Sequence, residues 1–340
     1  MEGRGGPEGL AGMMKVTAGV KCYNNVRHVR AALESAFAQS YRPLEIVVSD
    51  DGSTDGSWDV VREVVAAHKG EKGVEVVLNR NESNLGNLGN WEKICELASG
   101  EFVVKFDGDD ISLGDRVEKI VRAVEESRKA GGNPAVVGHG GWLISSSGKP
   151  MGEMYRAVPG NIVGAAMAFS KRCLTDFGKA TCDPKIVDDE LYALRGMMLG
   201  DFLEMPDKLV LYRMGTGVSN AHLEVRRPMS RIAREKLVAL SQNERDVACL
   251  RGGACVEVWR RRLADEREQA EARRDLIDGP SMRIRRAGAR RLRRDGGVWR
   301  FLKFAFVLPR FLGTPLLFAY AVARYASRRI AALRGCNRPA

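Results

Sequence analysis

Residues Phe102-Val-Val-Lys-Phe-Asp-Gly-Asp-Asp110 begin as an apolar run and end in three carboxylates around one glycine. The apolar positions are typical of a strand that is buried on both faces. The aspartates follow at its carboxyl end, which is where ligands bind in an open α/β sheet. Carboxylate oxygens at that position suit Mg2+ or Mn2+ carrying a diphosphate. Taken alone, the stretch also fits an acidic turn or the start of a helix, because Asp and Gly are common in turns.

Strands and helices alternate ahead of this stretch. The predicted strands are Val16–Val20, Leu44–Ser49 and Val74–Leu78. Apolar residues at helical spacing follow each of them. Together with the strand that begins at Phe102, they make four successive strand–loop–helix units, which imply a parallel, doubly wound sheet with right-handed crossovers. Because such a sheet places its loops on one edge, we expect Asp51, Asn84 and Asp107 to converge there.

The alternation continues after Asp110. We expect a helix over 117–124, strands over 135–144 and within 160–170, helices over 171–177 and 191–199, and strands over 202–205 and 208–212. The acidic cluster Val187-Asp-Asp-Glu190 opens the helix over 191–199. A helix N-terminus favours acidic residues on dipole grounds alone, so this cluster needs support from other motifs before it indicates a site.

Several short motifs share one order along the chain. They are Tyr23-Asn24, Asp50-Asp51-Gly52-Ser53-Thr54-Asp55, Asn84-x-Gly86 with Asn90, Gly100-Glu101-Phe102 and Asp107-Gly108-Asp109-Asp110. In this order and spacing they resemble the inverting nucleotide-sugar glycosyltransferases of family 2, which have the GT-A fold. Ala165 to Ser170, Asp188-Asp189 and Leu194-Arg195 extend the resemblance, which covers roughly residues 14 to 219.

The resemblance implies a donor-binding role for the first motifs. Tyr23 and Asn24 would line the nucleotide pocket, and Asp51 would hold the base or the ribose. The substrate-binding residues implied in this way are Tyr23, Asn24, Asp50, Asp51, Asn84, Gly86, Asn90 and Asp107.

The resemblance also implies a metal site and a catalytic base. Asp107 and Asp109 form the Asp-x-Asp element, in which Asp109 would be the direct ligand of Mn2+ or Mg2+ and Asp107 would lie nearer the ribose and diphosphate. A divalent cation stabilises the charge that grows on the leaving diphosphate. Asp189 falls where the family keeps its base, with Asp188 one residue away as the alternative. A base there would take the proton of the attacking acceptor hydroxyl.

Some features depart from the family or exclude other chemistries. The first strand reads Ala18-Gly19-Val20-Lys21-Cys22-Tyr23, where the family usually has a run like Ile-Pro-Val. The Gln-x-x-Arg-Trp sequence of processive polysaccharide synthases is absent from the chain, which favours the addition of one or a few sugars per encounter. The sequence also lacks a Gly-x-x-x-x-Gly-Lys-Ser/Thr loop, a Gly-x-Ser-x-Gly elbow and a His-Glu-x-x-His motif.

Positive charge is concentrated at the end of the chain. Residues 276–340 carry 15 Lys/Arg against two acidic residues, a net charge of +13, whereas the whole chain carries +11. The other residues therefore sum to about −2, so the basic composition says nothing about the predicted sheet. The seven cysteines are scattered, without a Cys-x-x-Cys pair, which favours a reduced, cytosolic compartment.

The basic tail also contains aromatic and aliphatic residues. Its longest uncharged run, Phe311–Ala323, has 13 residues, and a membrane-spanning helix needs about 20, so a full crossing is disfavoured. Basic residues interleaved with apolar ones suit a segment that lies on an anionic membrane surface. Nucleic acid is the competing partner, which we do not expect because the apolar run is too long and aliphatic for a phosphate-tracking surface. A pair of helices that docks onto another protein remains a further alternative.

The sequence therefore predicts an α/β protein with a GT-A sheet and a helical C-terminal extension. The expected parts are a disordered lead-in (1–13), the glycosyltransferase domain (14–222), a helical arm (223–278) and a basic, amphipathic, membrane-associating tail (279–340). The resemblance implies a metal-dependent inverting transferase that moves a sugar from a nucleotide-diphosphate donor to a glycan or lipid-linked acceptor in cell-surface polysaccharide synthesis. Its expected location is cytoplasmic, peripheral on the inner face of the cell membrane. The alternative is a noncatalytic nucleotide-sugar-binding or scaffold protein that keeps the fold.

Overall fold

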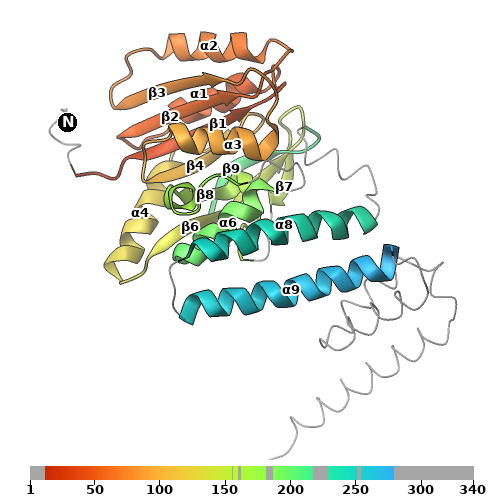
Figure 1. Cartoon of the computed structure of the whole chain (residues 1–340). Helices are drawn as coiled ribbons and strands as arrows, with labels where there is room; N and C mark the ends of the chain where they lie inside the picture. Colours follow the sequence, from red (N-terminus) through yellow and green to blue (C-terminus); the bar gives the residue numbers. More distant parts are fainter. Residues whose placement is uncertain are drawn as a thin grey trace, which may run out of the picture. The chain divides into compact units, whose positions relative to one another are not determined.

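The computed structural model describes residues 12–154, 156–159, 162–180, 187–216, 229–250 and 254–278. Its strands are β1 (Val16–Cys22), β2 (Leu44–Asp50), β3 (Val74–Arg80), β4 (Phe102–Asp107), β5 (Ile111–Ser112), β6 (Pro134–Ile144), β7 (Pro150–Met154), β8 (Met167–Ser170) and β9 (Asp201–Arg213). They form one sheet in the order β3-β2-β1-β4-β8-β6-β9-β5, with β7 paired to β6 (Figure 1).

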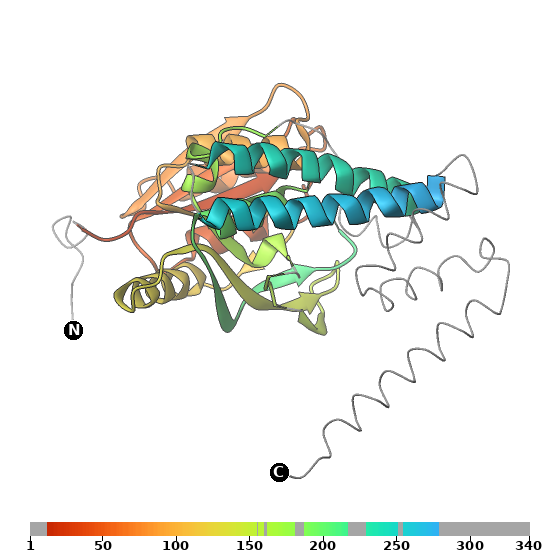
Figure 2. The ribbon, with the colours of Figure 1, turned by 60° about the horizontal axis from the view of Figure 1, so that its bottom comes forward.

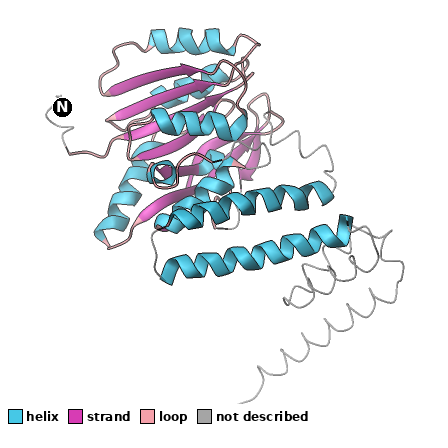
Figure 3. Cartoon of the chain, viewed as in Figure 1, coloured by secondary structure: helices cyan, strands magenta, loops and turns pink. Residues whose placement is uncertain are grey.

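Helices lie on both sides of this sheet (Figure 3). They are α1 (Val29–Phe37), α2 (Ser57–Ala67), α3 (Gly86–Leu97), α4 (Arg116–Lys129), the 3-10 turn η2 (Gly164–Ala166), α5 (Arg172–Thr175), α6 (Asp188–Leu199), α8 (Met229–Cys249) and α9 (Ala254–Asp278). The contacts divide the chain into two compact units, residues 1–227 with 238–263, and residues 228–237 with 264–340. The sheet and the helices that cover it belong to the first unit.

The first half of the sheet is parallel, and its inner strands β1 and β2 are fully buried. β1 pairs with β2 on one side and β4 on the other, and every residue of β1 and β2 is buried. Strands that are covered on both faces need continuous apolar runs, which is why these segments lack the alternation of a half-exposed strand. The predicted parallel α/β arrangement is confirmed for this half.

Two apolar clusters cover the two faces. Side chains of α1, α2 and α4 pack on one face, and those of α3, α5 and α6 pack on the other. Figure 1 shows α3 and α6 on the near side of the strands. Gly19 lets α3 come close, because a Cβ at that position would lie 2.6 Å from Ile94 Cγ2 and 3.2 Å from Trp91.

The second half of the sheet is mixed. β8 runs antiparallel to both β4 and β6, whereas β6 and β9 are parallel. The sequence predicted two strands over 202–205 and 208–212, but the structure joins them into β9. The register shifts between Gly138 and Gly140 of β6, opposite Pro206, absorb the break that the sequence indicated. The short strand β5 and the hairpin strand β7 were not predicted.

Part of the predicted helical arm belongs to the first unit. Residues 238–249 of α8 and 254–263 of α9 run side by side in both views (Figure 2). The predicted lead-in through residue 11 and the basic tail over 279–340 lie outside the described residues. Within the part of the chain that is described, no helix is both long and apolar enough to cross a membrane.

Candidate functional site

The predicted site residues gather where β1, β2 and β4 end. Cys22 is opposite Asp50 and Lys21 is opposite Asp107, so the acidic turns after β2 and β4 lie on either side of the end of β1. The backbone N–H of Asp51 donates to the carbonyl of Cys22 at 2.8 Å. The topology therefore places the two acidic motifs at the same edge, as the sequence predicted.

Asn24 joins the turn after β1 to the turn after β2. Its backbone N–H donates to Ser53 Oγ at 2.9 Å, and its Oδ1 accepts from the backbone N–H of Thr54 at 2.9 Å. Its φ of 50° lies in the left-handed region, which Asn tolerates better than most residues. The neighbouring Tyr23 is 41% exposed, so its ring is free to contact a ligand at this edge.

Asp51 organises the loop that precedes α3. Its carboxylate accepts hydrogen bonds from the backbone N–H groups of Leu85 (2.8 Å) and Gly86 (3.0 Å) and from Asn81 Nδ2 (2.9 Å). These N–H groups lie at the amino end of α3, where a helix leaves its donors unpaired and favours negative charge. Asn84 Oδ1 accepts from the same Gly86 N–H at 2.8 Å. Asp51 is only 3% exposed, and its hydrogen bonds thus hold the backbone of the Asn84–Gly86 loop.

Two other predicted donor-binding residues are buried beneath the loop. Asn90 accepts from Ser49 Oγ at 2.6 Å and donates to the carbonyl of Ser49 at 3.1 Å. Asp50 Oδ2 accepts from the backbone N–H of Ser53 at 3.0 Å, and its Oδ1 has no hydrogen-bond partner among the described residues. These two side chains contact the protein framework, whereas Tyr23 and Asn84 face outward.

The Asp107–Asp110 turn is held by Arg213 at the end of β9. The backbone N–H of Arg213 donates to Asp110 Oδ1 at 2.7 Å, and its Nε donates to the carbonyl of Asp109 at 2.8 Å. Asp107 is paired instead with Lys21, whose Nζ is 3.3 Å from Asp107 Oδ1. The turn therefore has a fixed backbone, and Asp109 has no ion-pair partner among the described residues.

The charge balance of this turn suits a divalent cation. Burial, together with the nearby charge of Asp107, raises the pKa of Asp109. Burial, with Asp109 and Asp107, raises the pKa of Asp110 well above its usual value. Among the described residues no three His, Cys, Asp or Glu side chains cluster closely enough to enclose a metal ion. Asp109 and Asp107 nevertheless fit Mn2+ or Mg2+, because such ions often take only one or two carboxylates and complete their shell with substrate oxygens and water.

The acidic start of α6 meets two buried lysines. Asp188 Oδ2 accepts from Lys21 Nζ at 3.0 Å and from Lys105 Nζ at 2.8 Å. Lys105 also forms an ion pair with Asp189. Burial opposes ionisation of Asp188, but the charges of Lys105 and Lys21 outweigh it and lower the pKa of that carboxyl. The side chain of Asp188 is 1% exposed and that of Asp189 is 24% exposed.

Sequence reasoning missed Lys21, Lys105 and Arg213 as parts of this site. A usable signal was present, since Lys105 lies within the opening apolar run and Lys21 directly follows the strand predicted over Val16–Val20. A lysine is seldom fully buried unless it is paired. A lysine within or beside a predicted buried strand therefore implied an acidic partner, although the identity of Asp188 as that partner required the fold.

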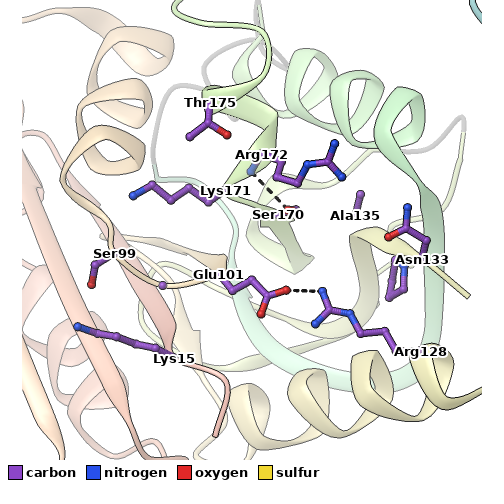
Figure 4. Close-up of a pocket in the computed structure, with 12 residues that line it drawn as sticks. Lys15, Ser99, Glu101, Arg128, Asn133, Ala135, Ser170, Lys171, Arg172 and Thr175 are labelled. Atoms are coloured by element: carbon purple, nitrogen blue, oxygen red, sulfur yellow. Dashed lines mark hydrogen bonds and ion pairs between the residues drawn. The ribbon is translucent and has the colours of Figure 1, made fainter. Parts of the chain in front are cut away.

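A cavity of about 560 Å³ lies elsewhere. It is lined by Lys15, Ser99, Gly100, Glu101, Arg128, Asn133, Pro134, Ala135, Ser170, Lys171, Arg172 and Thr175 (Figure 4). Lys15, Glu101 and Pro134 flank or begin strands β1, β4 and β6, so this cavity is at the opposite edge of the sheet. Arg128 is ion-paired with Glu101 and Arg172 with Asp176 at 2.7 Å, while Lys171 donates to the carbonyl of Ala98. The cavity is not part of the acidic site.

Comparison with known proteins gives a consistent family and fold. The family model described as "Glycosyl transferase family 2" matches residues 17–170. The putative glycosyltransferase EpsE of Bacillus subtilis is 30% identical over 145 residues, 43% of this chain and 49% of EpsE. A GalNAc(5)-diNAcBac-PP-undecaprenol beta-1,3-glucosyltransferase of Campylobacter jejuni is 28% identical over 181 residues, 53% of this chain and 57% of the relative. The matched segments thus span only about half of each of these two curated relatives.

Solved structures agree with the fold. TarS 1-349 of S. aureus in complex with UDP-GlcNAc has a TM-score of 0.52 at 16% identity, over 83% of this chain and 92% of that one. The mannosyltransferase PcManGT of Pyrobaculum calidifontis, in complex with GDP-Man and Mn2+, has a TM-score of 0.51 at 19% identity, over 95% of this chain and 81% of that one. At such identities the likeness shows the fold, which is the predicted GT-A fold.

Proposed function

We propose that this chain, which belongs to glycosyl transferase family 2, transfers a sugar from a nucleotide-diphosphate donor to a hydroxyl of a glycan or lipid-linked acceptor. The observation that carries the proposal is the position of Lys21. Its ammonium lies 3.3 Å from Asp107 and 3.0 Å from Asp188, so the acidic turn after β4 and the acidic start of α6 meet at one point. A donor-binding half and an acceptor-activating half are what such a transfer requires.

The donor half comprises the turns after β1, β2 and β4. Tyr23, Asn24 and the loop that Asp51 shapes would hold the nucleotide of the donor. Nucleotide sugars are bound in both solved structures of this fold, GDP-Man in PcManGT and UDP-GlcNAc in TarS. Asp109, with Asp107, would hold Mn2+ or Mg2+. When bound, the ion would supply Lewis-acid stabilisation of the leaving diphosphate. Arg213 keeps the backbone of this turn fixed, so Asp109 does not have to reorganise to meet the ligand.

The acceptor half centres on Asp189. Asp188 cannot serve well as a base, because both buried lysines already donate to its Oδ2 and it is 1% exposed. Asp189 is the more accessible carboxylate of the two. As general base it would take the proton of the acceptor hydroxyl during attack on the anomeric carbon, a contribution of about 10²- to 10⁴-fold. Attack opposite the leaving diphosphate inverts the anomeric configuration and needs no covalent enzyme intermediate.

Relatives suggest the class of acceptor. An E. coli relative, 25% identical over 109 residues, is named UDP-Glc:alpha-D-GlcNAc-diphosphoundecaprenol beta-1,3-glucosyltransferase WfaP. The Campylobacter jejuni relative is likewise named for a PP-undecaprenol acceptor. We extend this to a polyprenyl-diphosphate-linked acceptor in cell-surface polysaccharide synthesis. The net charge of +13 over 276–340 supports a location on the inner face of the membrane.

A donor panel tests the activity. Wild type is incubated with UDP- and GDP-sugars, an acceptor mixture and Mn2+ or Mg2+, and release of nucleotide diphosphate is measured. We expect release with at least one donor and its loss in Asp109→Ala. Asp115→Ala is the matched control, because Asp115 is an exposed acid just beyond the same turn, paired with Lys119 at 2.8 Å. Donor binding without turnover in wild type would instead support the noncatalytic alternative, and product NMR establishes whether the anomeric centre inverts.

Vesicle binding tests the location. The full chain and a chain that ends at Asp278 are sedimented with vesicles containing anionic lipid, neutral vesicles and duplex DNA as separate partners. We expect the full chain alone to bind, with a preference for the anionic vesicles. Equal sedimentation of both chains would remove the membrane proposal, and preferential binding to DNA would favour the nucleic-acid alternative.

A further inference from the structure

Lys105 contacts both acids at the start of α6 from within the sheet. It lies in the middle of β4, its side chain is 2% exposed, and its Nζ reaches Asp188 at 2.8 Å and forms an ion pair with Asp189. The ammonium is also 5.6 Å from the centre of the Trp91 ring, which borders it on the α3 side. A buried charge in this setting is costly unless partners surround it, so the ammonium and the two carboxylates hold one another in place.

Gly164 also borders the carboxylate of Asp189. It begins the 3-10 turn η2, and a Cβ at this position would overlap the carboxylate carbon and both oxygens of Asp189. Its φ is not in the left-handed region, so backbone conformation does not demand glycine here. The absence of a side chain at 164 serves the close approach of Asp189.

We propose that Lys105 and Gly164 are positioning residues that together fix the carboxylate of Asp189 for the reaction. Lys105 attracts one carboxylate oxygen, and Gly164 leaves the space that the group occupies. Neither residue need touch the substrate. This inference deepens the proposed function and rests on it, because it supposes that Asp189 takes a proton from an acceptor hydroxyl. A base that is displaced by about 1 Å can lose on the order of 10²-fold in rate. The position of the Asp189 carboxylate therefore matters more to turnover than to donor binding.

Lys105→Met and Gly164→Ala test the two positioning residues separately. In both variants we expect kcat to fall by about 10²-fold, while KM for the donor and Kd for the free nucleotide diphosphate stay within about twofold. Lys105→Arg should recover part of the lost kcat, because it restores the charge. Lys105→Met combined with Asp189→Asn should be no slower than Asp189→Asn alone, since residues that act as one unit are not additive.

Matched controls separate position from stability. Lys15→Met removes an ion-paired lysine just before β1, at the other edge of the sheet. Gly114→Ala adds a methyl where the nearest atom would be the Ala38 carbonyl oxygen at 3.1 Å. We expect both controls to keep kcat within about twofold of wild type, with melting temperatures compared for all variants. Unchanged kcat in Lys105→Met and Gly164→Ala, or equal losses in kcat and donor affinity, would overturn the inference.

Hydrogen exchange gives a readout that needs no turnover. If Lys105 seats Asp188 and Asp189, amides over 188–192 should exchange at least about tenfold faster in Lys105→Met, while those of α4 are unchanged. If wild type transfers no sugar with any donor, the proposed function fails, and the exchange data still decide whether Lys105 holds this helix start. If exchange over 188–192 in Lys105→Met matches wild type, Lys105 does not hold this helix start in place, even if the enzyme is active.

Discussion

Arg195 and Asp246 form a buried, two-bond ion pair that ties α6 to α8. Arg195 Nε lies 2.8 Å from Asp246 Oδ2, and Arg195 Nη2 donates to Asp246 Oδ1 at 3.0 Å. Neither side chain is more than 1% exposed. Arg195 Nη1 also donates to the carbonyls of Cys173 in α5 and Gly178 in the loop after it, so one guanidinium joins the helix that carries the proposed base to α5, to this loop and to α8.

Removal of Asp246 should therefore destabilise the domain strongly. Asp246→Ala leaves a buried guanidinium without its partner, and we expect a loss of about 3 to 5 kcal/mol in the free energy of unfolding. Urea denaturation followed by circular dichroism measures it. The control is Asp176→Ala, which breaks the half-exposed pair with Arg172 and should cost no more than about 1 kcal/mol. Similar losses in the two variants would mean that the buried pair contributes no more than a surface one.

His139 should make stability fall as the pH is lowered. Burial and the Arg116 charge lower the pKa of His139 well below 6.5, and Arg116 Nε donates to its Nε2 at 3.0 Å. Just below pH 6.5, His139 therefore binds a proton in the unfolded state but not in the folded state. The stabilisation is complete above the unfolded pKa of 6.5 and is lost as the pH falls below it, with a slope of up to about 1.4 kcal/mol per pH unit. Urea denaturation at about pH 8 and about pH 5.5 should show this slope reduced in His139→Gln.

His68 provides a control of opposite sign. Hydrogen bonds that the His68 ring donates to Glu34 and then to Glu71 oppose desolvation and raise the pKa of His68 above 6.5. Its contribution is therefore complete below 6.5 and is lost as the pH rises through the higher folded value. Because this ring is partly exposed, we expect only a weak dependence, and His68→Gln should remove it. A slope of the same sign at both histidines would contradict these assignments.

The framework of the site was predictable from sequence, whereas its internal pairing was not. Asp51 and Asp107 follow apolar runs whose strand character depends on local pattern alone, and parallel topology then brings the turns to one edge. The partnership of Lys105 with Asp188 joins residues 83 positions apart and depends on how α6 packs against β4. The residue pattern around either position does not indicate that contact. The same limit applies to Asp51: the sequence predicts a role at the ligand, but local pattern does not indicate that its carboxylate also accepts from the backbone N–H groups of Leu85 and Gly86.

Asp51 and Tyr23 should therefore behave differently when replaced. Asp51→Ala removes an acceptor from three donors in a buried position, so we expect a loss of about 2 kcal/mol or more in stability together with weaker nucleotide binding. Tyr23→Ala removes an exposed ring and should weaken nucleotide binding with stability unchanged within about 0.5 kcal/mol. Calorimetric titration with UDP and GDP, beside urea denaturation, distinguishes the two. Full stability in Asp51→Ala would show that its hydrogen bonds to the loop contribute little.

Asp109 should make nucleotide diphosphate binding depend on a divalent cation. It has no ion-pair partner among the described residues, whereas Asp107 is neutralised by Lys21 and Asp110 Oδ1 accepts a hydrogen bond from the backbone N–H of Arg213. With Mn2+ present, we expect wild type to bind nucleotide diphosphate at least about tenfold more tightly than after treatment with a chelator. In Asp109→Asn the two affinities should coincide, because the substituted amide keeps the shape but lacks the charge that recruits the ion. Asp115→Ala should retain the full metal response, and an Asp109→Asn protein that retains it as well would place the cation elsewhere.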